Sequence, residues 1–168
     1  MSEQETVLIV DDVPANVDLL EALLAKFNFN ILKASSGQEA LEIAKKEHPN
    51  LVLLDVMMPG LNGFQVCEKL REDQTFAAVP IIIVTAKAVE DKDIVESLEK
   101  GADDYVIKPV NGEDLSKKVK SLLAKAKNGD LPSQYYKEVK KKRADGKAEM
   151  TDYSRLLDLD KIDEEEKK

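Results

Sequence analysis

Up to about residue 127, short apolar runs alternate with longer amphipathic stretches. The apolar runs are rich in β-branched residues, as strands are, and the strongest are Val7–Val10, Leu51–Leu54 and Ile81–Val84. Two weaker runs are Phe29–Ala34 and Tyr105–Ile107. The alternation predicts an α/β protein built from five strand–helix units. Its sheet would be parallel and covered by helices on both faces.

The stretches between the runs carry helical spacing. In the first, apolar residues recur at steps of three and four, which puts on one helix face Val13, Val17, Leu20, Leu24 and Phe27. The last stretch has the same pattern. Those beginning at Gly37, Gly63 and Ala88 are less regular, but none contains an internal proline before its end.

The polarity of the runs indicates the order of the strands. A strand buried on both faces is continuously apolar, which suits the first, third and fourth runs. The second contains Asn30 and Lys33, and the fifth is short and flanked by Asp103 and Lys108, so these two are expected at the edges. The prediction is a doubly wound five-stranded parallel sheet of order 2-1-3-4-5. Its ligand crevice would open at the carboxyl ends of the first and third strands.

Polar residues stand at the carboxyl ends of four of these strands. The first is followed by Asp11 and Asp12, the third by Asp55, the fourth by Thr85 and the fifth by Lys108. Three carboxylates at one rim repel one another, with each close pair costing several kcal/mol at an effective dielectric constant of ~20. An all-oxygen site of this kind suits a hard divalent cation, Mg²⁺ foremost.

A dication, an ammonium, a hydroxyl and a free carboxylate together can place a phosphoryl group on that carboxylate. Asp55 follows the central strand, so we expect it to be the acceptor, with Asp11 and Asp12 as metal ligands. Taken singly, each residue has an ordinary interpretation; the aspartates before Pro14, for example, suit the start of a helix. Their joint occurrence at one predicted rim favours the site.

Over about residues 5–125 the chain resembles the receiver domain of two-component response regulators. The resemblance rests on VLIVDD at 7–12, LVLLDVMMPGLNGF at 51–64, IIVTA at 82–86 and GADDYVIKP at 101–109. It implies a flavodoxin-like (βα)5 fold and a phosphoacceptor, Asp55, that is phosphorylated by a histidine kinase. It also implies Mg²⁺ held by Asp11, Asp12 and Asp55 with the backbone carbonyl of Met57.

The resemblance assigns further roles. Thr85 matches the switch hydroxyl and Tyr105 the aromatic residue that moves with it. Lys108 matches the phosphate-pairing lysine, and its bond to Pro109 the family's cis peptide. The face formed by the fourth helix, the fifth strand and the fifth helix would then change for a downstream protein or for a second copy. Met57 and Lys87 occupy the positions that tune phosphoryl lifetime.

Composition narrows the class of protein. The chain has 168 residues and a net charge of −8, and this acidic balance argues against direct nucleic-acid binding. A single cysteine excludes an internal disulfide, and no apolar run approaches the ~20 residues of a membrane span. We therefore expect a cytoplasmic protein without membrane contact. The resemblance implies that it is a signalling protein and not a conventional enzyme, catalysing only its own phosphotransfer and slow dephosphorylation.

The domain boundary is expected near Asn128, where the sequence NGDLP breaks the last helix. Residues 1–127 would form the receiver domain. Residues 128–168 would be a charged C-terminal extension, partly helical or disordered, and too short for a usual winged-helix or cyclase output domain. Within it, Met150, Tyr153 and Leu157 fit an apolar helical stripe.

Two other classes of protein fit the sequence less well. A haloacid-dehalogenase-type phosphatase also forms an aspartyl phosphate, but its nucleophile follows the first strand in an Asp-x-Asp pattern, whereas this strand is followed by Asp11-Asp12-Val13. A flavodoxin-like electron carrier needs a phosphate-cradling loop at that place, and the two aspartates would repel the phosphate.

Overall fold

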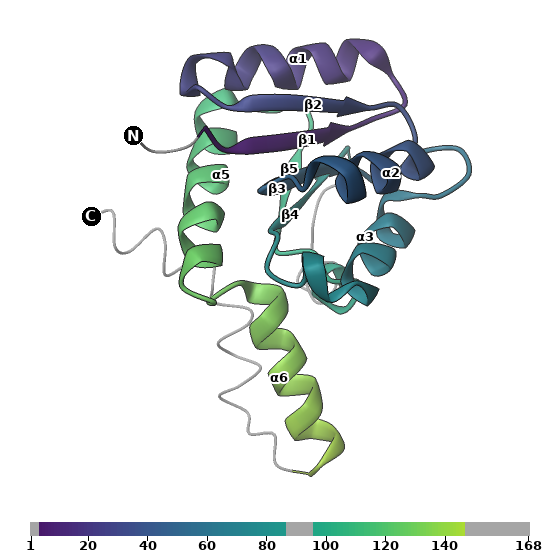
Figure 1. Ribbon diagram of the computed structural model, residues 1–168, viewed down its shortest axis with the longest axis vertical. Helices are drawn as coiled ribbons and strands as arrows, with labels where there is room; N and C mark the ends of the chain where they lie inside the picture. The colour runs from purple at the N-terminus through teal and green to yellow at the C-terminus, as the bar shows by residue number, and fades with distance from the viewer. Residues whose placement is uncertain (1–3, 87–95, 147–168) are drawn as a thin grey trace.

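A single parallel sheet organises the protein in the computed structural model, which describes residues 4–86 and 96–146. Its strand order is β2-β1-β3-β4-β5, and all four pairings are parallel (Figure 1). The predicted order is confirmed. The strands are β1 Thr6–Val10, β2 Asn30–Ala34, β3 Leu51–Asp55, β4 Ile81–Thr85 and β5 Asp104–Ile107.

Helices cover both faces of the sheet. The apolar core on one face is closed by α1 and α5, and the core on the other face by α2 and α3 (Figure 1). The helices are α1 Pro14–Leu24, α2 Gly37–Glu47, α3 Gly63–Glu72, α5 Gly112–Lys127 and α6 Pro132–Ala144, with 3₁₀ turns at Ala25–Phe27 and Gln74–Phe76. Most of the stretch predicted to be helical from Ala88 to Lys100 lies outside the described residues, and residues 96–99 are helical.

Burial follows the polarity of the strands. Every residue of β3 is buried, as are the apolar residues of β4 and Val7–Val10 of β1. In β2 only Ala34 is buried, and in β5 only Val106. The two strands with polar residues are therefore the edges, because an edge position leaves their side chains access to water.

The helical face predicted for the first stretch is only partly right. Val17, Leu20 and Leu24 are buried against the sheet. Val13, however, precedes the helix as its N-cap residue and is 45 % exposed. Phe27 lies in the 3₁₀ turn after α1, half-buried against the same core. Pro14 fixes the start of the helix, which leaves Val13 outside the helical repeat.

The start of α3 is packed tightly against the end of β3. Asn62 caps the helix with a capping box, in which Gln65 completes the reciprocal pair of hydrogen bonds. The next residue, Gly63, donates its N–H to Val56 O at 2.9 Å. A Cβ atom at Gly63 would lie 2.3 Å from the carbonyl oxygen of Asp55, so only glycine allows this approach.

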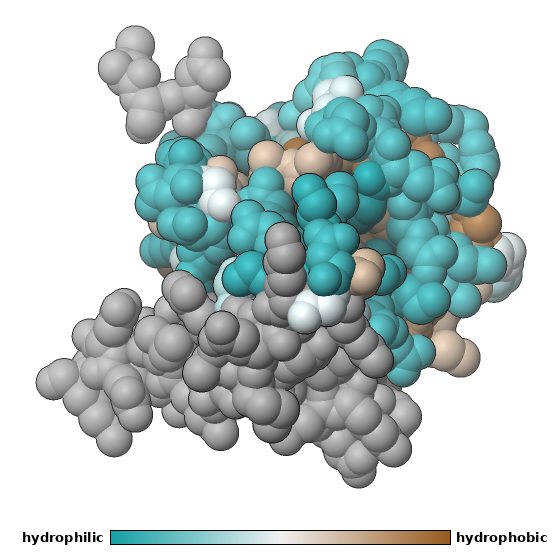
Figure 2. All heavy atoms as spheres, turned by 90° about the horizontal axis from the view of Figure 1, so that it is seen from below, coloured by the Kyte–Doolittle hydropathy of each residue, from teal (hydrophilic) through white to brown (hydrophobic). Residues whose placement is uncertain are grey.

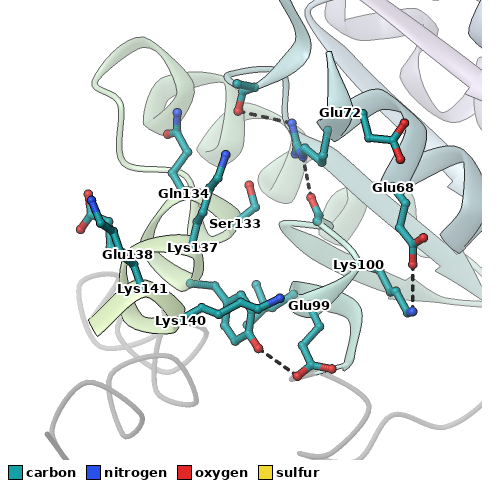
Figure 3. Close-up of a pocket in the computed structure, with 15 residues that line it drawn as sticks. Glu68, Glu72, Glu99, Lys100, Ser133, Gln134, Lys137, Glu138, Lys140 and Lys141 are labelled. Carbon is teal, nitrogen blue, oxygen red and sulfur yellow. Dashed lines mark hydrogen bonds and ion pairs between the residues drawn. The ribbon is translucent and has the colours of Figure 1, made fainter. Parts of the chain in front are cut away.

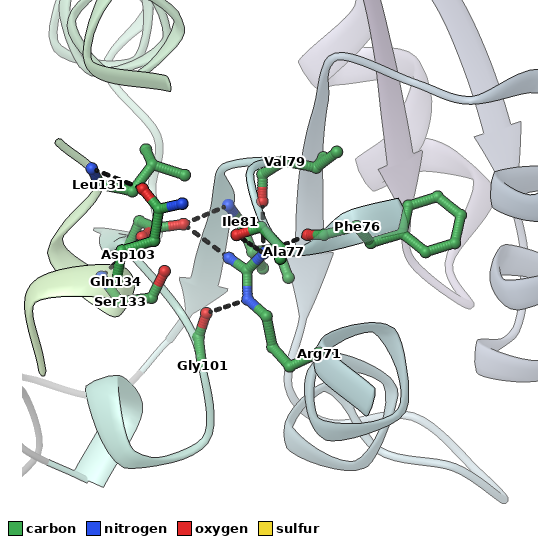
Figure 4. Close-up of polar contacts among 10 residues, drawn as sticks. All are labelled: Arg71, Phe76, Ala77, Val79, Ile81, Gly101, Asp103, Leu131, Ser133 and Gln134. Atoms are coloured by element: carbon green, nitrogen blue, oxygen red, sulfur yellow. Dashed lines mark hydrogen bonds and ion pairs between the residues drawn. The ribbon is translucent and has the colours of Figure 1, made fainter. Parts of the chain in front are cut away.

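The helix α6 is joined to the domain by a buried polar cluster. Asp103, just before β5, accepts hydrogen bonds from the N–H of Ser133 (2.9 Å), from the N–H of Ile81 (2.9 Å) and from Arg71 Nη2 (2.8 Å) (Figure 4). Burial raises the pKa of Asp103, while Arg71 and the contact with Ser133 act to lower it. Leu131, fully buried at the start of α6, belongs to the core on the α1 and α5 face.

Arg71 binds several loops at once. Its guanidinium donates to the carbonyl oxygens of Phe76, Val79 and Gly101 at 2.6–2.8 Å, as well as to Asp103. The planar fork of an arginine carries five N–H donors, so it can meet several carbonyl and carboxylate acceptors together. We call Arg71, Asp103 and Ser133 the α6 anchor.

Among the described residues, no helix combines the length and apolar character that crossing a bilayer requires.

We predict that Gly63→Ala destabilises the fold by about 1–3 kcal/mol, because the added methyl group displaces the backbone at Asp55 and Val56. Urea unfolding measures the change. Gly60→Ala is the matched control, since Gly60 lies in the same loop with open space around it. Its cost comes only from its positive φ of 74° and should be smaller. Equal effects of the two changes would contradict the steric argument.

We also predict that Leu131→Ala costs about 2–5 kcal/mol of unfolding free energy, because it leaves a cavity in the core. A loss this large from a position beyond residue 127 would show that the start of α6 is part of the cooperative unit. Lys127→Ala, at an exposed neighbouring position, serves as the comparison and should change stability by less than about 0.5 kcal/mol. A small effect of Leu131→Ala would mean that α6 folds and detaches independently.

Candidate functional site

The acidic residues meet at the carboxyl ends of β1 and β3. Asp11 and Asp12 follow β1, and Asp55 is the last residue of β3. The register places Val10 beside Leu54, so the residues that follow emerge at the same rim. One carboxylate oxygen from each of the three aspartates lies within 4.8 Å of the others.

Burial makes this cluster electrostatically costly. Asp11 is 1 % and Asp55 7 % exposed, so water screens their charges poorly. Two carboxylates about 5 Å apart repel by about 3 kcal/mol at an effective dielectric constant of ~20. Burial, and then the nearby charge of Asp11, raise the pKa of Asp55. The site therefore favours a compensating positive charge.

Lys108 supplies part of that charge. Its Nζ lies 3.3 Å from Asp55 Oδ1 and 3.4 Å from Asp11 Oδ2. Burial acts to lower the pKa of Lys108, but Asp55 and Asp11 outweigh it and raise the pKa above its usual value. The lysine is thus held as an ammonium between two carboxylates.

The other predicted residues lie on β4, on β5 and in the loops that follow β3 and β5. Thr85 ends β4 one position beyond Val84, the register partner of Asp55, and is half-buried. Tyr105 lies on β5, half-buried, with Lys118 Nζ 4.7 Å from its ring centroid. Met57 is 82 % exposed in the loop after β3. The Lys108–Pro109 peptide bond is cis.

The donor set fits Mg²⁺ by its chemistry. All side-chain donors of the cluster are carboxylate oxygens, which are the ligands this hard cation prefers, and no thiol or imidazole takes part. Lys87, which is predicted to tune the lifetime of the phosphoryl group together with Met57, lies outside the described residues.

Two residues with reactive side chains lie elsewhere. Cys67 is fully buried in α3, and burial raises the pKa of its thiol to about 12, which agrees with the interpretation of a small core residue. His48 ends α2 in the left-handed conformation, with its ring 6.2 Å from that of Phe76.

Some residues that position the site were not predicted. Gly63 lets α3 approach the backbone of Asp55, and the pair Asn62-Gly63 before a helical stretch is a signal that could have indicated a close turn. Asp103 was interpreted only as a mark of an edge strand. Its role as an acceptor for Arg71 and Ser133 depends on contacts more than 29 residues apart in sequence, which no local pattern encodes.

Comparison with known proteins agrees with this geometry. The response regulator receiver domain family matches residues 7–120. Protein PilH of Pseudomonas aeruginosa is 44 % identical over 118 residues, which cover 70 % of this chain and 97 % of PilH. The probable transcriptional regulator ycf27 of Porphyra purpurea is 43 % identical over 125 residues, covering 74 % of this chain and 50 % of ycf27.

Solved structures agree on the fold. A putative response regulator from Chloroflexus aurantiacus superimposes with a TM-score of 0.69 at 33 % identity, over 73 % of this chain and 99 % of that one. The chain spans about half the length of several curated relatives that it matches. The fold, the acidic cluster and the family match lead to one conclusion: the chain belongs to the receiver-domain family of two-component response regulators.

Proposed function

We propose that Asp55 is the phosphoacceptor of this receiver domain. A histidine kinase or a phosphotransfer protein would donate the phosphoryl group from a phosphohistidine. The N–P bond of the donor breaks, an O–P bond to an oxygen of Asp55 forms, and the imidazole leaves. The observation that carries this proposal is the 3.3 Å contact of Asp55 with Lys108, inside a cluster that also contains Asp11 and Asp12.

The surrounding residues have complementary roles in this proposal. Asp11, Asp12 and Asp55, with the backbone carbonyl of Met57, would hold Mg²⁺. The bound ion would supply positive charge to the phosphoryl oxygens during transfer. Lys108 would then pair with the product phosphoryl group, because its ammonium already contacts Asp55. Thr85, at the end of the neighbouring strand, would donate its hydroxyl.

Phosphorylation turns one negative charge at Asp55 into about two and adds acceptor oxygens. In the proposed switch, Thr85 moves toward these oxygens and Tyr105 fills the space it leaves. The face formed by β5, α5 and the helical segment before β5 then changes its shape. This face would bind a downstream protein or a second copy of the chain, without direct binding to nucleic acid or membrane.

The protein would act as a cytoplasmic signalling phosphoacceptor. Its chemistry would be limited to its own Mg²⁺-dependent phosphotransfer and a slow dephosphorylation. The phosphatase and the electron carrier are not supported, because the family match assigns the chain to neither class and Asp55 lies at the end of β3, not after β1.

We predict that Asp55→Asn abolishes labelling by acetyl phosphate with Mg²⁺, measured by intact-protein mass spectrometry. The amide cannot form the acyl phosphate, although it keeps the shape of the side chain. Asp130→Asn, which makes the same change at an exposed position, should label normally. Undiminished labelling of Asp55→Asn would remove the central assignment.

We further predict that labelling requires Mg²⁺ and stops in excess chelator. Asp12→Asn should raise the Mg²⁺ concentration needed for half-maximal labelling by about tenfold or more, because it removes one charged ligand. The labelling rate is measured against Mg²⁺ concentration, with Asp130→Asn again as the control. An unchanged Mg²⁺ requirement in Asp12→Asn would exclude that residue as a ligand.

A further inference from the structure

The contacts of α6 with the receiver domain include one in its first turn and one about a turn later. Its first turn is held by the α6 anchor, where the N–H of Ser133 donates to Asp103. One turn later, Tyr136 Oη donates to Glu99 Oε1 at 3.0 Å (Figure 3). Glu99 belongs to the helical segment 96–99, which directly precedes β5 in the chain.

Beyond these contacts α6 projects away from the sheet (Figure 1). A cleft of about 680 Å³ separates it from α3, with Glu68 and Glu72 on the α3 side and Lys137, Lys140 and Lys141 on the α6 side (Figure 3). In the view from below, the visible described residues are mostly hydrophilic (Figure 2). The cleft leaves space between α3 and the described part of α6 that follows its first turn.

Both attachments lie on the segment that leads to the acidic cluster. Asp103 immediately precedes β5, and Lys108 immediately follows it, so a strand of four residues joins the anchor to the lysine that contacts Asp55. Leu98 and Ala102 are buried, which fixes the segment that bears Glu99 against the core. A displacement of β5 therefore moves the points that hold α6.

We propose that the docking of α6 on the receiver domain is coupled through β5 to the state of Asp55. The position of α6 then depends on whether Asp55 is phosphorylated. This inference rests on the proposed function of Asp55. The Tyr136–Glu99 bond stabilises the arrangement in which Lys108 contacts both Asp55 and Asp11. Phosphorylation of Asp55 gives Lys108 a phosphoryl group as its partner. This change disfavours the docking of α6.

Linkage makes the coupling reciprocal: if occupancy of the site loosens α6, then loosening α6 must tighten binding at the site. Beryllofluoride with Mg²⁺, a stable mimic of the phosphoryl group, serves as the probe, and calorimetric titration measures its affinity for the full chain. We expect Tyr136→Phe and Glu99→Ala each to bind it about fivefold more tightly. The double variant should match the single ones, because either change breaks the same bond.

Glu96→Ala is the matched control, since Glu96 lies exposed on the same helical segment and its loss removes the same charge. Its affinity for beryllofluoride should equal that of the unmodified chain. Unchanged or weaker binding by Tyr136→Phe and Glu99→Ala would overturn the proposed coupling, as would tighter binding by Glu96→Ala.

Hydrogen exchange gives an independent measurement. The amides of Gln134 and Tyr135, both bonded to Leu131 O, should exchange several-fold faster when beryllofluoride and Mg²⁺ are added. If the probe binds and protects the loops around Asp55 but leaves the exchange of these amides unchanged, the proposed coupling is wrong. The proposal that Asp55 is the phosphoacceptor is then unaffected. If the probe does not bind at all, the proposed function itself fails.

Discussion

The repulsion among three aspartates at the carboxyl ends of β1 and β3 is the constraint on which the site depends. Folding brings their oxygens within 4.8 Å of one another and removes two of them almost completely from water. The hydrophobic burial of the central strands supplies the free energy that holds them there. Lys108 offsets part of the cost, because its ammonium contacts Asp55 and Asp11. The remaining negative charge suits a site for Mg²⁺.

The sequence was sufficient to predict the sheet because the pattern that distinguishes each strand lies within that strand. Continuous apolar runs distinguish buried strands, and the polar residues Asn30 and Lys33 mark an edge, so the order followed from composition and connection rules. Once that order was known, Asp11, Asp55 and Lys108 had to meet at one rim. Boundaries were less well determined: Val13 has the spacing of the α1 face, yet Pro14 starts the helix after it.

The α6 anchor shows where local patterns fail. Ser133, Asp103 and Arg71 belong to three distant parts of the chain, and no local pattern indicates that they contact one another. Their meeting depends on the closure of the whole domain, and the same is true of Leu131, a single apolar residue after a break. The assignment of residues 128–168 as a separate extension stays a prediction, although Leu131, near the start of that segment, is buried in the core.

The way α6 leaves the domain has a consequence for protein engineering. A reporter fused after Gly146 to a chain shortened there would be joined to the described end of α6, whose first turn is held by a guanidinium, a carboxylate and an amide N–H. Fusion after Lys127 would discard the amide N–H of Ser133 together with Leu131, and would leave Asp103 without this donor. The two junctions differ by 19 residues in sequence, and they would give the cargo very different freedom of orientation.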